Sequence, residues 1–222
     1  MTDTEKKSVS PHRRTIGIVI ATDIEAQPFI AALHLSPVGR MPCLLYGRDG
    51  LILAVSGVGK TNSAVATTYL CSAFHPALIL NLGAAGSTGL RCRLGDIFQV
   101  SAVCEPDRPH YPSGRPSLHR PRTLPGFDEA TLATHDRPII DKEDREKASL
   151  HAEMVDMEGA AVVQAARRFS IPCLLFKFVS DTPGQSDTAA AIEYMREHSR
   201  VFCRFIMERV IPLVEALKPF VK

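Results

Sequence analysis

Near its start the chain reads Ile16-Gly17-Ile18-Val19-Ile20-Ala21, a run without a polar side chain that is followed at once by Thr22 and Asp23. A short run rich in β-branched residues and bounded by polar ones predicts a strand buried on both faces of a sheet. Two further apolar runs, at residues 77–82 and 171–179, fit the same description. We therefore expect a sheet whose central strands are covered on both sides.

Segments with helical spacing or composition separate these runs. They cover residues 24–33, 60–73, 142–150, 158–169 and 188–217. We expect Asp156 to cap the fourth of these helices and the last to bend before Pro212. Strands that alternate with helices indicate an α/β fold with a largely parallel or mixed central sheet, in one domain.

Two segments depart from this alternation. The short apolar runs at 43–46 and 51–55 flank Gly47-Arg48-Asp49-Gly50, which predicts a β-hairpin. Residues 105–126 contain six prolines and four arginines without apolar periodicity. That composition predicts a long loop of the kind that often covers an active site.

Composition and charge exclude several classes of protein. The chain has 222 residues, 45% of them hydrophobic, and 26 basic against 24 acidic residues, so its net charge is only +2. Binding driven by overall charge to nucleic acid or to an anionic membrane is therefore not expected. The apolar runs are far shorter than the ~20 residues of a membrane-spanning helix. Six cysteines without a CxxC pair, and eight histidines without an HExxH pair, give no support for a disulfide framework or a metal site.

The first fourteen residues are polar and charged, and no apolar segment of signal-peptide length follows them. We expect residues 1–14 to be a disordered tail, residues 15–222 to form the catalytic domain, and the protein to be cytoplasmic.

Carboxylates stand at three places that follow apolar residues: after the first apolar run, before the helix expected at 158–169, and after the last apolar run. They are Asp23 and Glu25, Asp156 and Glu158, and Asp181. Ligands of open α/β sheets gather at the carboxyl ends of strands, and the glycine-rich segments 56–59 and 83–86 would let backbone N–H groups approach a ligand there. Each carboxylate alone could be a helix-terminal charge or part of a turn. Their coincidence predicts an acidic pocket that recognises hydroxyl groups.

The segment Ala54-Val55-Ser56-Gly57-Val58-Gly59-Lys60-Thr61 resembles a phosphate-binding loop, but Ala54 stands where that motif requires glycine. A nucleotide hydrolase stays an alternative, which would need magnesium and Lys60. No GxSxG elbow of a serine hydrolase is present.

Several motifs, in this order and separation, resemble the purine nucleoside phosphorylase/uridine phosphorylase superfamily, and within it the 5′-methylthioadenosine/S-adenosylhomocysteine nucleosidases. These motifs are the first strand with Glu25, Ser56-Gly57-Val58-Gly59-Lys60, Asn81-Leu82-Gly83-Ala84-Ala85-Gly86, Leu94-Gly95-Asp96-Ile97, Val155-Asp156-Met157-Glu158 and Val179-Ser180-Asp181. The resemblance implies a three-layer α/β/α domain with a mixed, partly barrel-like sheet. It also implies cleavage of the N-glycosidic bond of a purine nucleoside without a metal or cofactor.

The resemblance carries roles over to single residues. Glu158 and the Met157 backbone would hold the ribose 2′- and 3′-hydroxyls. Glu25 would position and deprotonate the attacking water, and Gly86 would line the pocket beside it. Asp181, oriented by Ser180, would face the purine N7, and the backbone of Ile139 would meet the base.

The chemistry requires these residue types. A ribosyl C–N bond breaks through an oxocarbenium-like state, so the sugar needs negative charge nearby and the leaving base needs a proton. For Asp181 to act as the acid, burial or neighbouring carboxylates must raise its pKa, which predicts a dry and acidic pocket.

Hydrolysis is favoured over phosphorolysis. Phosphorolytic members of the superfamily carry a Gly-Asp-Pro turn with a nearby arginine after the first strand, where this chain has Ala21-Thr22-Asp23-Ile24-Glu25. Ser180-Asp181 favours an adenine-type leaving base, as in methylthioadenosine or adenosylhomocysteine. However, Pro138 aligns with the aromatic residue that stacks on the base in those nucleosidases, and Ala84 aligns with a serine. A phosphorylase, a hydrolase of a futalosine-like or adenosylhopane-like nucleoside, and a non-catalytic nucleoside-binding protein stay open. The resemblance further implies a homodimer.

Overall fold

The computed structural model describes residues 15–89, 91–110, 112–183 and 188–216. Its strands are β1 (Ile16–Ile20), β2 (Ser36–Gly39), β3 (Leu44–Arg48), β4 (Leu51–Val55), β5 (Leu78–Ser87), β6 (Ile97–His110), β7 (Arg115–His119), β8 (Glu129–Thr134), β9 (Met154–Asp156) and β10 (Cys173–Asp181). Its helices are α1 (Asp23–Ala32), α2 (Lys60–Phe74), α3 (Lys142–Ser149), α4 (Gly159–Arg168), α5 (Thr188–Phe205), the π-helical turn η1 (Ile206–Val210) and α6 (Ile211–Ala216). The expected tail at 1–14 lies outside the described residues.

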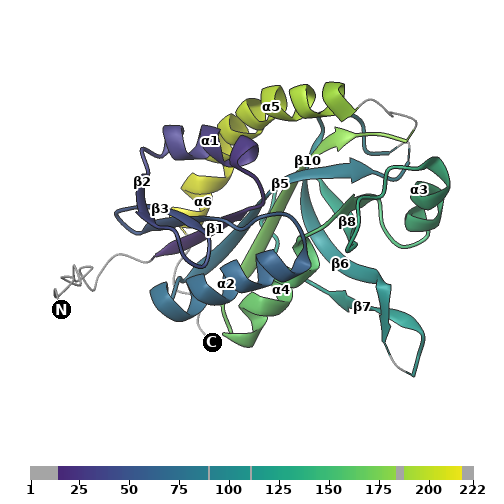
Figure 1. The fold of residues 1–222 in the computed structure, drawn as a ribbon, viewed down its shortest axis with the longest axis horizontal. Helices are drawn as coiled ribbons and strands as arrows, with labels where there is room; N and C mark the ends of the chain where they lie inside the picture. Colours follow the sequence, from purple (N-terminus) through teal and green to yellow (C-terminus); the bar gives the residue numbers. More distant parts are fainter. Residues whose placement is uncertain (1–14, 90, 111, 184–187, 217–222) are drawn as a thin grey trace.

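The strands form one mixed sheet with helices on both faces, which confirms the three-layer α/β/α architecture (Figure 1). Helices α1, α5 and α6 cover one face, and α2 and α4 cover the other. The strand order is β10-β6-β8-β9-β5-β1-β4-β3-β2, and β10 also pairs with β5. Five strands, β5, β10, β6, β8 and β9, therefore close into a ring, while β1, β4, β3 and β2 extend β5 as an open sheet. This confirms the partly barrel-like sheet.

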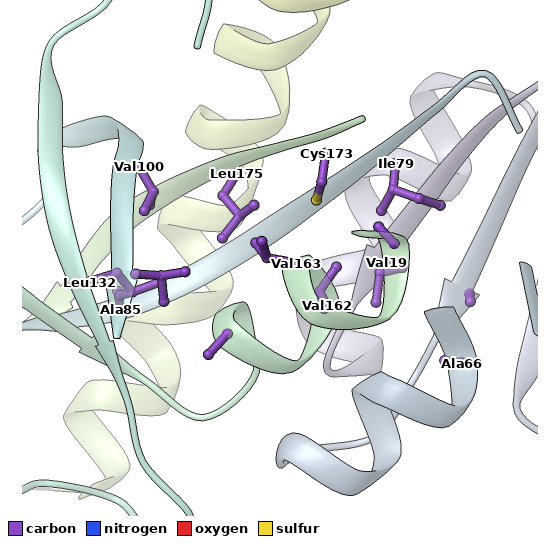
Figure 2. Close-up of a cluster of buried hydrophobic side chains, with 14 of the residues drawn as sticks. Val19, Ala66, Ile79, Ala85, Val100, Leu132, Val162, Val163, Cys173 and Leu175 are labelled. Atoms are coloured by element: carbon purple, nitrogen blue, oxygen red, sulfur yellow. The ribbon is translucent and has the colours of Figure 1, made fainter. Parts of the chain in front are cut away.

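Each face of the sheet has its own hydrophobic core. On the α2/α4 face, Ala66, Val162 and Val163 pack towards the strand residues Val19 and Leu175 (Figure 2). On the opposite face, Phe29 of α1 meets Phe202 of α5 edge-on, with ring centroids 6.0 Å apart. Apolar residues on both faces of the central strands thus explain the uninterrupted runs in the sequence.

The predicted hairpin is confirmed. Strands β3 and β4 pair antiparallel, and the turn residues Asp49 and Gly50 have positive φ angles of 34° and 85°. A π-helical turn, η1, separates α5 from α6 just before Pro212, where we predicted a bend.

The prediction of a loop over 105–126 is wrong for residues 105–110 and 115–119, which lie in strands. Strand β6 continues to His110, and β7 returns antiparallel beside it, with Val103 opposite His119. In the described sheet β7 pairs only with β6. Prolines are tolerated in such an edge strand because its outer N–H groups have no ladder partner to lose. The proline-rich composition therefore concealed a two-stranded arm.

No helix in the described ranges is both long and apolar enough to span a membrane.

Candidate active site

Four ionisable side chains that are far apart in the sequence meet beside the carboxyl ends of β1 and β9. Glu25 lies in the first turn of α1, Asp156 ends β9, and Glu158 directly precedes α4. Lys177 reaches them from within β10, and its side chain is only 2% exposed. Three carboxylates thus surround one buried ammonium group, which we call the acid cluster.

Glu25 is held from two sides. Its Oε2 accepts hydrogen bonds from the Thr22 backbone N–H (3.1 Å) and hydroxyl (2.6 Å), which completes a capping box at the start of α1. Its Oε1 accepts the backbone N–H of Ala84 at 2.8 Å. A Cβ on Gly83 would lie 2.9 Å from Oε1, so the glycine leaves room for this carboxylate. The capping box and the contact to β5 together fix Glu25 in a buried position.

Asp156 is fully engaged inside the protein. One oxygen accepts the Thr134 hydroxyl at 2.6 Å, and the other accepts the Gly159 N–H at 2.8 Å and lies 3.0 Å from Lys177 Nζ. Burial alone would lower the pKa of Lys177, but Asp156 and then Glu158 raise it above its ordinary value. Asp156 therefore holds the start of α4 and the buried cation. Glu158 occupies the N-cap position of α4, but the side chain that accepts the first helical N–H is that of Asp156, as expected.

Glu158 is buried, and its pKa is shifted from the ordinary value of a glutamate. Burial, followed by the neighbouring Asp156, raises its pKa to about 7. Its Oε1 accepts the N–H of Gly59 at 2.8 Å. Gly59 has a φ angle of 102°, a conformation that favours glycine. Near neutral pH this carboxyl therefore exists both with and without its proton.

The same contact removes the basis for the nucleotide-hydrolase alternative. Glu158 occupies the N–H of Gly59 at the start of α2, where a phosphate would bind in that hypothesis. Lys60 is bound to Asp107 at 2.6 Å and to Glu105 at 3.3 Å. Asp107 in turn accepts the Asp136 N–H at 2.7 Å, so Lys60 helps to hold the loop that leads to Ile139.

Asp181 forms a second charged group, at the end of β10. Its Oδ1 accepts the Ser180 hydroxyl at 2.7 Å, the arrangement that the resemblance implies. Its Oδ2 forms an ion pair with Nη2 of Arg145, a residue that sequence reasoning missed. The Asp181 side chain is 27% exposed. The environment of Asp181 is therefore neither as dry nor as acidic as we predicted.

The other predicted site residues surround these groups. Gly86 stands opposite Asp181 in the register of β5 and β10, and the Arg145 guanidinium lies against it. Ile139 is buried in a small apolar cluster with Val155, which pairs with Gly86. Met157 is half-buried and lies between Asp156 and Glu158 in the sequence. The structure thus brings these predicted residues near the two charged groups, and the sequence gave no role to Lys177 or Arg145.

A hollow of about 1530 Å³ lies at the opposite end of the sheet. It is lined by the first residues of three strands, Ile16, Leu78 and Cys173, and by none of the predicted site residues. Because ligands of α/β sheets bind at the carboxyl ends of strands, the acid cluster rather than this hollow is the candidate active site. Within the described residues, no group of three or more His, Cys, Asp or Glu side chains is arranged to hold a metal ion.

Comparison with known proteins agrees with the observed fold. A family model described as "Phosphorylase superfamily" matches residues 15–211. The chain therefore belongs to the phosphorylase superfamily, a family of enzymes.

The similar proteins are nucleoside hydrolases by name. The chain is 27% identical, over 188 residues, to the 5′-methylthioadenosine/S-adenosylhomocysteine nucleosidase of Hydrogenovibrio crunogenus, covering 73% of this chain and 81% of the relative. The fold matches two solved Helicobacter pylori structures. The first, a 5′-methylthioadenosine/S-adenosylhomocysteine nucleosidase, has a TM-score of 0.81 at 20% identity and covers 93% of this chain and 100% of its own. The second, a futalosine hydrolase, has a TM-score of 0.82 at 19% identity and covers 94% of this chain and 100% of its own.

Proposed function

We propose that this protein hydrolyses the N-glycosidic bond of a purine nucleoside to give the free base and a ribose derivative. One observation carries the proposal: Glu25 and Glu158, both buried, flank the single ammonium of Lys177 at the carboxyl ends of the strands. Such a cluster supplies negative charge for an oxocarbenium-like sugar and a base for water. The curated relatives named nucleosidases support the same reaction.

At the sugar, Glu158 would accept hydrogen bonds from the ribose 2′- and 3′-hydroxyls, with the Met157 backbone beside it. Both oxygens of a carboxyl group act purely as acceptors when it is ionised, because protonation turns one of them into a donor. Because the pKa of Glu158 is about 7, binding of the diol would draw this group into its ionised form.

At the anomeric carbon, Glu25 would position a water molecule and accept its proton while the C1′–N9 bond breaks. The bonding electrons leave with the base, and the water oxygen bonds to C1′. Gly86 would line this part of the pocket. Asp181, oriented by Ser180, would act on the base at N7, and the Ile139 backbone would bind the base.

Water rather than phosphate is the proposed nucleophile. The turn after β1 offers Asp23 and Glu25 and no arginine, so an approaching phosphate would be repelled. Phosphorolysis is the second candidate reaction, because the superfamily bears the name of phosphorylases.

The leaving base is adenine if the chain follows the curated relatives, whose names specify methylthioadenosine and adenosylhomocysteine. Because the chain shares its fold with a futalosine hydrolase, a futalosine-like nucleoside is the second candidate substrate.

We also propose that the enzyme acts in the cytoplasm as a homodimer. Six described cysteines are free, five of them buried, which suits a reducing compartment. Light scattering coupled to gel filtration tests the dimer.

The proposed reaction is tested by chromatography of the products in phosphate-free buffer. The panel is methylthioadenosine, adenosylhomocysteine, 5′-deoxyadenosine, adenosine, inosine and futalosine. Release of free base without phosphate is the expected result. Release only after phosphate is added would overturn the role of Glu25, and no release from the panel would overturn the proposed hydrolysis of these nucleosides.

A further inference from the structure

Arg145 lies in the proposed base-binding end of the site, although it belongs to the charged helix α3. Its side chain is only 4% exposed. Nη1 donates to the Ser87 carbonyl at 2.6 Å, and Nη2 pairs with Asp181. A buried arginine with two fixed partners is positioned by the fold rather than loose on the surface.

Gly86 leaves the space that this guanidinium occupies. A Cβ on Gly86 would come within 2.5 Å of Cζ of Arg145, so any larger residue would collide with the guanidinium. The planar guanidinium therefore packs directly against the backbone of Gly86. This is a close approach that requires glycine.

One donor of Arg145 is unused. Its Nε is buried and finds no hydrogen-bond partner among the described residues. A buried N–H without an acceptor is costly, and such a group at a binding site indicates a ligand acceptor. Guanidinium groups only donate and stay charged at physiological pH, so the missing partner must be an acceptor or an anion.

We propose, on the basis of the proposed function, that Arg145 determines base specificity and selects a leaving purine with an oxygen at position 6. A 6-oxopurine offers O6 and N7 as adjacent acceptors, the edge that arginine recognises in guanine. Adenine instead presents an amino donor at position 6, which faces the donors of Arg145 unfavourably. This inference departs from the adenine-type base that the sequence favoured.

The positive charge of Arg145 would also stabilise such a base as it leaves. When C1′–N9 breaks, the electron pair stays on the base and spreads over its ring nitrogens and O6. A fixed guanidinium stabilises that developing anion without transferring a proton. The water proton passes to Glu25 and then to solvent, from which the base takes up one proton. In this scheme Asp181, held by Ser180 and Arg145, positions the cation and does not itself contact N7, which departs from the contact with N7 proposed above.

The experiment compares inosine with adenosine, which differ at position 6 of the base. We measure kcat/KM for the wild type, Arg145→Met and Arg145→Lys, together with binding of hypoxanthine and adenine by calorimetry. Arg196→Met is the matched control, because Arg196 is 54% exposed and pairs only with Glu193 among the contacts described. Thermal unfolding of each variant checks that it is folded.

The wild type is expected to prefer inosine and hypoxanthine. Arg145→Met should reduce the inosine-to-adenosine ratio by about tenfold or more, Arg145→Lys should fall between, and the control should keep the ratio. A wild type that prefers adenosine would overturn the inference and leave the proposed hydrolysis standing. Equal losses for both nucleosides would also overturn it. If no nucleoside is cleaved but hypoxanthine binds through Arg145, the inference stands and the proposed reaction fails. If neither base binds, the inference fails.

Discussion

Replacing Glu158 by glutamine should change how the stability of the protein depends on pH. The amide oxygen of glutamine can still accept the Gly59 N–H, but the side chain no longer titrates. In the wild type, the folded pKa of about 7 lies above the ordinary value of 4.5. Between these values the native state binds more protons than the unfolded chain, so stability falls as pH rises.

The magnitude follows from the two pKa values. Between pH 5 and pH 8 this single group should lower the free energy of unfolding of the wild type by roughly 2 to 3 kcal/mol. The free energy of unfolding of Glu158→Gln should not fall in this way. From pH 5 to pH 8 the variant should therefore become more stable relative to the wild type by the same roughly 2 to 3 kcal/mol. A fixed cost of the amide would appear equally at both pH values and cancel from the comparison.

Urea unfolding at pH 5, 6, 7 and 8 measures the effect for the wild type and the variant. Glu193→Gln is the control, because Glu193 is 70% exposed and its loss should not alter the pH dependence appreciably. If the wild type and Glu158→Gln show parallel curves that stay within about 1 kcal/mol of each other, the reasoning is refuted.

Three further substitutions test the remaining charged groups. Glu25→Gln should abolish release of the base, and it should cost about 1 to 2 kcal/mol of stability, because glutamine has one acceptor oxygen where Glu25 uses both, one for Thr22 and one for Ala84. Urea unfolding and the chromatographic assay measure both effects, and retained turnover would place the water elsewhere. Lys177→Met should destabilise the protein by about 3 to 5 kcal/mol, because it leaves Asp156 buried without its cation; a change in the urea midpoint worth under about 1 kcal/mol would contradict the buried pair. Asp181→Asn should reduce kcat by at least about a hundredfold while nucleoside binding persists, and an unimpaired variant would remove Asp181 from the reaction.

The sequence was sufficient for the layers of the fold because burial on both faces leaves an unmistakable pattern. The run at 16–21 forms β1, and the carboxylates expected at three places lie at or just after the ends of β1, β9 and β10. The arm of β6 and β7 was missed because proline lowers strand propensity in general, although an edge strand tolerates it.

Lys177 and Arg145 show two different limits on predicting a site. Lys177 is the only charged residue in the apolar run 171–179, and a charge inside a buried strand requires a partner; that signal was present and unused. Arg145 stands among Lys, Glu and Asp residues in α3, where a solvated helix face is the usual interpretation. Its inward direction depends on how α3 packs against the ring, which no local pattern encodes.

Strand β5 belongs to both the closed ring and the open sheet, and this sharing has a consequence for how the molecule comes apart. Its residues pair with β1, β10 and β9 in turn. Unfolding of either the ring or the open sheet would remove hydrogen-bonding partners from β5. We therefore expect the two parts to unfold together. In native-state hydrogen exchange, the amides of Leu80 and Leu82 should therefore exchange only through global unfolding, whereas those of the β7 arm should exchange through local opening.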